Sequence, residues 1–237
     1  MTDPLLELSS VVKDYRGLRP LRIEHARLNA GEQLALLGVD QHAAEVLINL
    51  LTGATLPDRG TVNLFGRSSA EIADSTDWLA TVDRFGIVSA RAVLLEGLSV
   101  AQNLAVPFSL EIEPLPDALR DRAIAAGREA GLAEADWDRA ASALAPSSRL
   151  RLRLARALAL GPAVVLLEHP TVDVPRSEVV GLGRDVRGIL ERRGAAGLTL
   201  TADREFALAV AGRVVELDPV TGRLAEAKRR WFGLRRT

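Results

Sequence analysis

The sequence predicts an α/β fold in which a mostly parallel sheet is covered by helices. Strand-length apolar runs alternate with amphipathic stretches from end to end, and two of these runs, 33–38 and 163–168, are apolar enough for buried strands. The 237 residues, 48% hydrophobic and 26% charged, suit a folded domain. Because no repeat or low-complexity linker divides the chain, one domain is expected at 1–225, with a helical insertion at about 89–160 and a tail at 226–237.

Turn residues set the limits of the expected elements. Strands are expected at 5–12, 21–28, 33–38, 61–65, 163–168, 197–201 and 213–217. The second strand alternates apolar and polar residues, which is typical of a half-buried edge strand. Helices are expected just after 45, at 117–130, at 177–193 and at 203–211. Gly53 ends the first helix, whereas Pro116 and Gly131 bound the second.

Composition excludes several classes of function. The absence of cysteine excludes disulfides, thiolate catalysis and cysteine-ligated zinc, and no metal site is expected. A net charge of -1 gives no electrostatic case for binding nucleic acid. No apolar run approaches the roughly 18 residues of a membrane-spanning helix, and the N-terminus does not resemble a signal sequence. We therefore expect the protein in the cytoplasm.

The segment after the run 33–38 lies where a phosphate-binding loop occurs, between a strand and a helix. The pattern of such a loop is G-x-x-x-x-G-K-[ST], in which lysine neutralises phosphate charge and the hydroxyl holds magnesium. Gly38 fits the first position, but Ala43, Ala44 and Glu45 stand where glycine, lysine and Ser/Thr are required. By pattern alone, the chain has no phosphate loop.

The flanking segments nevertheless resemble a known family. They are 36–38, 47–53, 57–60, 93–104, 154–160 and 163–171. Together they closely resemble the ATP-binding subunits of ABC transporters, nearest those of lipoprotein-release and cell-division systems. The resemblance implies the ABC-type P-loop NTPase fold, with a mostly parallel sheet, an antiparallel edge subdomain and a helical insertion.

The resemblance also assigns roles to individual positions, most of which differ from the family's pattern. The nucleotide-binding positions are Tyr15, Gly38, Asp40, Gln41, His42, Ala43, Ala44, Glu45, Ala90 and Glu168. The signature positions are Leu144, Ala145, Pro146, Ser147 and Ser148, instead of Leu-Ser-Gly-Gly-Gln. His169 stands at the catalytic-glutamate position and Ala202 at the switch-histidine position. We interpret these positions as vestigial, with no catalytic residue and with weak or no binding of ATP and magnesium.

Electrostatics favours this interpretation. Two unit charges 4 Å apart interact by about 4 kcal/mol at an effective dielectric near 20, and the loop loses a positive charge at Ala44 while gaining a negative one at Glu45. Our hypothesis is that Glu45 fills the anion site at the helix start, so that Ala44→Lys with Glu45→Ser recovers nucleotide binding. The alternative is that Glu45 is an unusual magnesium ligand.

Other residues leave two interpretations open. His169 is either a general base or a histidine tolerated in a site that no longer works. Tyr15 either stacks on a base or simply packs. The arginines from Arg149 to Arg156 alternate with apolar residues, which is typical of a strand, but the resemblance places a helix there. The basic and aromatic tail either contacts anionic lipid or is a frayed terminus.

These observations predict a cytoplasmic ABC-type subunit, peripheral at the membrane through a permease, that binds ATP poorly and does not hydrolyse it. Its expected partners are the membrane permease and a second ABC-type subunit, in a homo- or heterodimer. In such a dimer each ATP site pairs one subunit's loop with the other's signature. The alternatives are an active ATPase with atypical residues and a soluble interaction protein that retains the fold.

Overall fold

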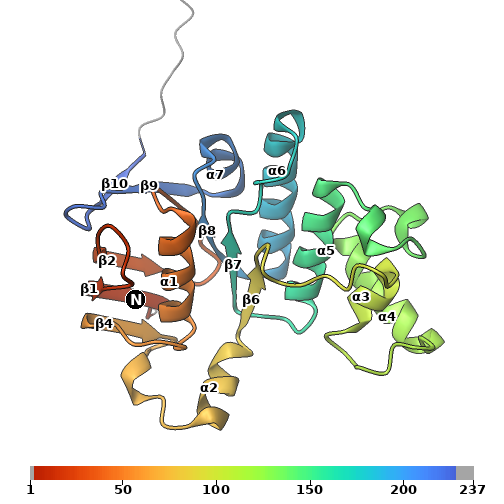
Figure 1. The fold of residues 1–237 in the computed structure, drawn as a ribbon, viewed down its shortest axis with the longest axis horizontal. Helices are drawn as coiled ribbons and strands as arrows, with labels where there is room; N and C mark the ends of the chain where they lie inside the picture. The colour runs from red at the N-terminus through yellow and green to blue at the C-terminus, as the bar shows by residue number, and fades with distance from the viewer. Residues whose placement is uncertain (1–2, 228–237) are drawn as a thin grey trace, which may run out of the picture.

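Two β-sheets form the centre of the molecule, whose computed structural model describes residues 3–227 (Figure 1). The larger sheet has the order β10-β9-β3-β8-β7-β6 and the smaller one β2-β1-β4-β5. The strands are β1 (Leu6–Lys13), β2 (Leu21–Leu28), β3 (Gln33–Leu37), β4 (Arg59–Leu64), β5 (Arg67–Ser68), β6 (Phe85–Val88), β7 (Val164–Glu168), β8 (Ala196–Leu200), β9 (Arg213–Leu217) and β10 (Leu224–Glu226). The helices are α1 (Gln41–Leu51), α2 (Ser75–Val82), α3 (Val100–Ala105), α4 (Asp117–Glu129), α5 (Pro146–Leu158), α6 (Arg176–Arg193) and α7 (Arg204–Val210), with 3-10 turns at Ser69–Glu71, Glu134–Asp136 and Ala141–Ala143.

Five strands of the larger sheet are parallel, and only β10 runs antiparallel to its neighbour. Leu36 of β3 pairs with Leu200 of β8, and Leu200 in turn pairs with Glu168 of β7. The carboxyl ends of these strands therefore lie at one edge of the sheet. In open α/β sheets this edge is where ligands bind.

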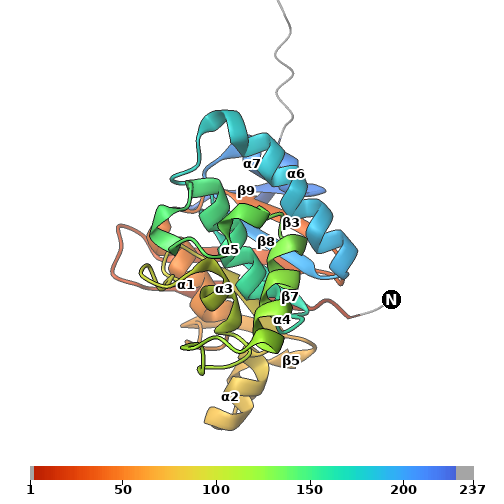
Figure 2. The same cartoon turned by 90° about the vertical axis from the view of Figure 1, so that its right-hand side faces the viewer.

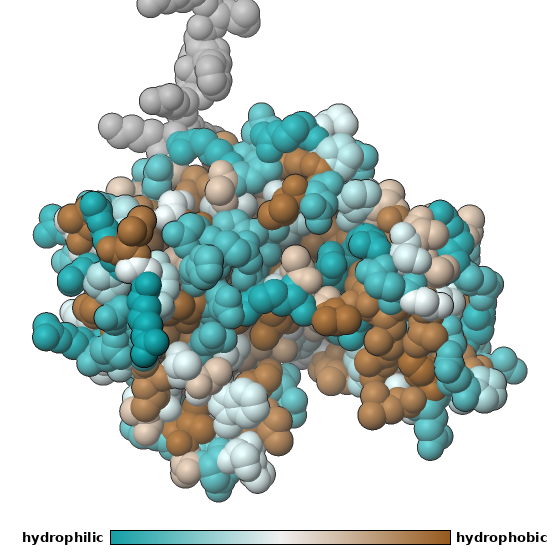
Figure 3. Space-filling model, in the orientation of Figure 1, coloured by the Kyte–Doolittle hydropathy of each residue, from teal (hydrophilic) through white to brown (hydrophobic). Residues whose placement is uncertain are grey.

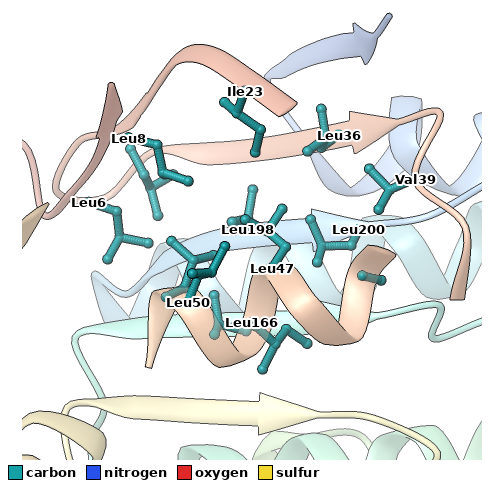
Figure 4. Packing of buried hydrophobic residues seen from close by; sticks show 14 of the residues in the cluster. Leu6, Leu8, Ile23, Leu36, Val39, Leu47, Leu50, Leu166, Leu198 and Leu200 are labelled. Atoms are coloured by element: carbon teal, nitrogen blue, oxygen red, sulfur yellow. The ribbon is translucent and has the colours of Figure 1, made fainter. Parts of the chain in front are cut away.

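The two faces of the larger sheet bury different apolar clusters. One cluster joins the larger sheet, the smaller antiparallel sheet and α1, and it includes Leu36, Leu198, Ile23 and Leu47 (Figure 4). The other face packs against α5, α6 and α7. Each fully buried Leu or Ile side chain stabilises the fold by about 1.5–3 kcal/mol relative to an exposed one. This burial fixes α1 against the carboxyl edge of the sheet.

The helical region has an apolar cluster of its own, centred on Trp137 and Leu104. Figures 1 and 2 both place α5 between the larger sheet and the helices α3 and α4. Leu150, Leu154 and Leu158 of α5 belong to the cluster under the sheet, whereas Leu152 and Ala155 belong to the cluster of the helical region. One helix therefore contributes to both cores.

The predicted fold class is confirmed, since the structure has a mostly parallel sheet, an antiparallel edge sheet and helices inserted between β6 and β7. The helix expected around the arginines 149–156 is also present, as α5. The sequence did not predict α2 or β6, and β4 begins at Arg59, two residues before the strand expected at 61–65. Of the predicted tail, residues 228–237 lie outside the described residues. Within 3–227, no helix has both the length and the apolar character needed to cross a membrane.

Candidate functional site

The candidate site lies at the carboxyl edge of the larger sheet, where segments from four elements meet. β3 leads into Gly38 and the N-terminus of α1, and β7 ends with Glu168. Arg91 follows β6 by three residues, and Ala202 follows β8 by two. The parallel register brings these segments together although more than 160 residues separate the first from the last.

The side chain of Asp40 caps the N-terminus of α1. Gly38 has φ +84°, and a Cβ there would lie 2.8 Å from the carbonyl oxygen of Leu217, so that only glycine fits. Asp40 has extended backbone angles, and its Oδ1 accepts the backbone N–H of Ala43 at 2.8 Å. Such a cap stabilises a helix by roughly 0.5–2 kcal/mol. α1 consequently begins at Gln41, within the segment where a phosphate loop would curve around its ligand.

This geometry shows that the hypothesis of Glu45 as the anion at the helix start is wrong. Glu45 lies in the second turn of α1, where its Oε1 is 2.7 Å from Nη1 of Arg91. Asp40 instead supplies the negative charge at the helix N-terminus, the position that favours an anion. Ala43 is 8% exposed and Ala44 is fully buried in the core cluster around α1. A lysine side chain at position 44 would begin inside the core, and for this reason we now expect no recovery of binding by that substitution.

Arg91 connects Glu45 to Glu168. Arg91 Nη2 lies 2.8 Å from Oε2 of Glu168, and Arg91 Nε donates to the same oxygen at 3.3 Å. Gln41 Nε2 donates to the other oxygen, Oε1 of Glu168, at 2.9 Å. The side chain of Glu168 is fully buried, whereas those of Glu45 and Arg91 are 44% and 43% exposed. A buried carboxylate needs such partners because its desolvation costs several kcal/mol.

His169, directly after β7, is held in an unusual backbone conformation. Its φ is +41°, its backbone N–H donates to the carbonyl oxygen of Leu200 at 2.8 Å, and its buried Nε2 has no hydrogen-bond partner among the described residues. Ala202 is exposed and has no group that transfers a proton. Its neighbour Asp203 is engaged in capping α7, since Oδ1 accepts the backbone N–H of Glu205 at 3.1 Å. Within residues 3–227, neither Ala202 nor Asp203 therefore forms a hydrogen bond with His169 Nε2.

The signature positions form the start of α5 and the end of the segment before it. Leu144 is buried, and Ala145 is the N-cap residue but makes no side-chain cap. Pro146 occupies the first turn and has no N–H, while Ser147 and Ser148 are half-buried. A cavity of about 370 Å³ joins this helix start to the other positions, and its lining includes Ala90, Leu144, Pro146, Arg153 and His169. Burial lowers the pKa of Arg153, and the nearby Arg149 lowers it further.

Tyr15 lines a second cavity, of about 610 Å³, together with Asp40, His42 and Ala43. Burial raises the pKa of Tyr15, and the negative charge of Asp40 raises it further. The ring also packs against the first core cluster and lies over Gly17, where a Cβ would be 2.5 Å from it. Tyr15 therefore both packs and faces a cavity large enough for a small ligand.

The described residues do not fit a magnesium–triphosphate complex. The position of the magnesium-binding hydroxyl carries the carboxylate of Glu45, the N–H of Ala43 is occupied by Asp40, and the guanidinium of Arg91 lies between Glu45 and Glu168. In residues 3–227, no three His, Asp or Glu side chains gather as a set of metal ligands. Arg91 was not predicted from the sequence, in which its only signal is a lone arginine directly after Ala90, one of the nucleotide-binding positions that the resemblance assigns.

The strand order, the helix that follows β3 and the helices between β6 and β7 define a P-loop NTPase fold of the ATP-binding-cassette type. The chain belongs to the ABC transporter family, whose sequence model matches residues 22–172.

Relatives and solved structures agree with this assignment. The chain is 29% identical to a sulfate/thiosulfate import ATP-binding protein, CysA, of Rhodopseudomonas palustris, over 90% of this chain and 60% of the relative. It is 28% identical to a lipoprotein-releasing system ATP-binding protein, LolD, of Alcanivorax borkumensis, over 86% of this chain and 90% of the relative. The chain therefore spans about 60% of the length of the import proteins that it matches.

The fold is similar to that of cbiO1 from Clostridium perfringens, part of the ABC transporter complex cbiONQ, with a TM-score of 0.79 at 20% identity over 94% of this chain and 88% of the other. It is also similar to a dimeric ATP-binding cassette, MJ0796, in a post-hydrolysis state bound to ADP and Pi, with a TM-score of 0.72 at 20% identity over 94% and 99% of the two chains. At this identity the two structures show a shared fold.

Proposed function

We propose that the protein is a cytoplasmic ABC-transporter subunit that supports a transport complex without hydrolysing ATP. The family, and the relatives named as import and lipoprotein-releasing ATP-binding proteins, support a role in transport. The loss of hydrolysis rests on this chain's own residues. In this role the subunit acts as a scaffold or regulatory half beside an active one.

The observation that carries the proposal is the position of Arg91 between Glu45 and Glu168. ATP hydrolysis by this family needs magnesium held beside the phosphates and a carboxylate that activates water. Here a guanidinium neutralises Glu168, and the residue after it is His169, whose Nε2 is buried and unpartnered among residues 3–227. No described group at the site both accepts a proton from water and faces a bound phosphate.

The signature positions extend this argument to a dimer. If the ATP sites are shared between two subunits, one site receives this chain's α1 start and the other receives its α5 start. The first offers the carboxylate of Asp40 at the helix start, with Glu45 bonded to Arg91 one turn further on. The second offers Ala145 and Pro146, with neither a capping hydroxyl nor an N–H at the first helical position. A homodimer would then be impaired at both sites, which favours a heterodimer with a competent partner.

Docking on a membrane permease fits the surface of the helical region. Val93, Leu110 and Leu160 are exposed there, and Figure 3 shows apolar side chains gathered over this part of the molecule, at the right of the view. A groove of about 220 Å³ between β6, α5 and the segment after α3 is lined by Ile87, Val106 and Arg156, among others. Apolar surface of this kind is typical of an interaction site. The proposed contact of the tail with anionic lipid concerns residues outside those described.

The test is phosphate release from ATP by the purified chain, measured with magnesium in the presence and absence of vanadate. We expect no vanadate-sensitive turnover and no magnesium-dependent ATP binding in a parallel titration. Glu168→Gln is the matched control, because activity that persists in this variant comes from a contaminant. Turnover by the wild-type chain that Glu168→Gln abolishes would establish the alternative, an active ATPase with atypical residues.

Localisation separates the proposal from a soluble interaction protein. A transport subunit is expected to sediment with membranes when its permease is co-expressed and to stay in the supernatant without it. Val93→Asp with Leu110→Asp should weaken this association, since both side chains are exposed and neither belongs to a core cluster. Recovery only in the soluble fraction in every case would rule out the transport role.

A further inference from the structure

Arg91 holds together three segments that are distant in sequence. Its guanidinium bonds to Glu45 on α1 and to Glu168 at the end of β7, while its own backbone belongs to the segment that leads from β6 into the helical region. The backbone N–H of Arg91 also donates to Ser89 Oγ at 3.0 Å, which fixes this segment after β6. The carboxyl edge of the sheet is thus connected to the helical region by one side chain.

The cluster brings two carboxylates, those of Glu45 and Glu168, to one guanidinium. Carboxylate oxygens are ligands that magnesium and manganese bind, whereas Gln41 presents its amide N–H to Glu168. Between the two carboxylates lies a permanently charged guanidinium, whose donors satisfy Glu45 and Glu168 at 2.7 and 2.8 Å. Arg91 therefore supplies the positive charge that a divalent ion would supply to the same two carboxylates.

We propose that Arg91 is an internal substitute for a divalent cation, which keeps α1, β7 and the segment after β6 joined in the absence of any ligand. The inference rests on the proposed function in one respect, because an ATP-hydrolysing site would need that position for magnesium. It goes further in assigning Arg91 a positive structural role. Removal of its guanidinium should leave the buried carboxylate of Glu168 without its cation and open the position to a divalent ion.

The test uses manganese alone as the probe, with free Mn²⁺ followed by electron paramagnetic resonance during titration of the whole chain. We expect Arg91→Ala to bind one Mn²⁺ about tenfold or more tighter than the wild type, since two carboxylates are then uncompensated. Adding Glu168→Gln to this variant should abolish the gain. Arg91→Lys retains a cation and should bind Mn²⁺ as weakly as the wild type.

Arg176→Ala is the matched control for charge. Arg176 also bridges two carboxylates, Asp203 at 2.6 Å and Glu205 at 2.7 Å, but both lie at the start of α7, where Asp203 already caps the helix. The two alanine variants have the same net charge. An equal gain in Mn²⁺ affinity for Arg176→Ala would show a general effect of charge and would overturn the proposal.

Thermal unfolding provides a second measurement that does not depend on one variant. The wild-type midpoint should not change with Mn²⁺, whereas that of Arg91→Gln should be lower and should rise when Mn²⁺ is added. A rise in the wild type that Glu168→Gln removes would overturn the proposal even if Arg91→Ala does not fold. ATP hydrolysis by the wild type would instead overturn the proposed function, so that the two failures are distinguishable.

Discussion

Asp40 Oδ1 accepts the backbone N–H of Ala43 at 2.8 Å and thereby occupies the donor that opens toward a ligand in a phosphate loop. The carbonyl oxygen of Asp40 also accepts the N–H of Ala44 at 2.9 Å. Two N–H groups at the start of α1, those of Ala43 and Ala44, are thus satisfied by the chain itself.

Asp40→Ala should destabilise the protein by about 0.5–2 kcal/mol, because the N–H of Ala43 loses its acceptor. Asp40→Asn should retain nearly all of the stability, since asparagine is an equally good N-cap. Denaturant unfolding monitored by circular dichroism measures both. If the two variants lost the same stability, the charge of Asp40 rather than its capping hydrogen bond would be what α1 requires.

Ala44→Lys combined with Glu45→Ser should not recover ATP binding. Ala44 is 0% exposed and packs in the core, so that the larger side chain should cost about 1–3 kcal/mol from overpacking alone. Glu45→Ser by itself is the control, because it leaves the core intact and only frees Arg91. Isothermal titration with Mg-ATP gives the answer, and binding restored by the double variant but absent in the control would refute our description of the α1 start.

Two glycines of α6 should respond in opposite directions to the same substitution. A Cβ on Gly183 would lie 2.7 Å from Cβ of Ala209 on α7, whereas a Cβ on Gly181 meets no atom within 4 Å. Gly183→Ala should therefore destabilise the fold by about 1–3 kcal/mol. Gly181→Ala should stabilise it by up to about 1 kcal/mol through helix propensity. Urea unfolding of the two variants beside the wild type tests the contact, and equal effects would exclude close packing of α6 on α7.

The stability of the helical region should fall in acid because of Glu134. Arg128 and then Trp137 Nε1 hydrogen-bond its carboxylate and lower its pKa from 4.5 to about 2. Because the pKa is lower in the folded state, this contribution is present above about pH 4.5 and is lost as the pH falls toward 2.

Glu134→Gln should accordingly flatten the dependence of the unfolding midpoint on pH within this window. Glu111→Gln is the control, since Glu111 is exposed and has no ion-pair partner in the described part of the chain. An unchanged profile for Glu134→Gln would mean that the carboxylate is not held by Arg128 in solution.

Most of the fold was predictable because its central strands are buried on both faces. The residues of β3 and β7 are all buried, so that both read as unbroken apolar runs. α2 was missed for the opposite reason, since none of its residues is buried and no apolar periodicity marks it. β6 has only four residues, which is short for a sequence signal.

The site was less predictable, because its contacts join distant residues. Aspartate is a common N-cap residue, but Asp40 was considered only as a position of the phosphate-loop pattern. Arg91 meets Glu168 across 77 residues, and only the parallel register of β6 and β7 brings them together. The resemblance assigned nucleotide-binding roles to individual positions, and Arg91 is not one of them. It therefore gave no indication that Arg91 forms ion pairs with Glu45 and Glu168.

The arginine and leucine alternation of α5 has a consequence for motion within the molecule. Its leucines at 150, 154 and 158 pack under the sheet, and Leu152 packs with the helical region. If α3 and α4 rotate relative to the sheet, α5 either moves with them and loses its contacts with β6, or stays with the sheet and loses its contacts with Leu104 and Trp137. A displacement of α3 and α4 is therefore transmitted to the sheet through α5, beside the connection that Arg91 makes after β6.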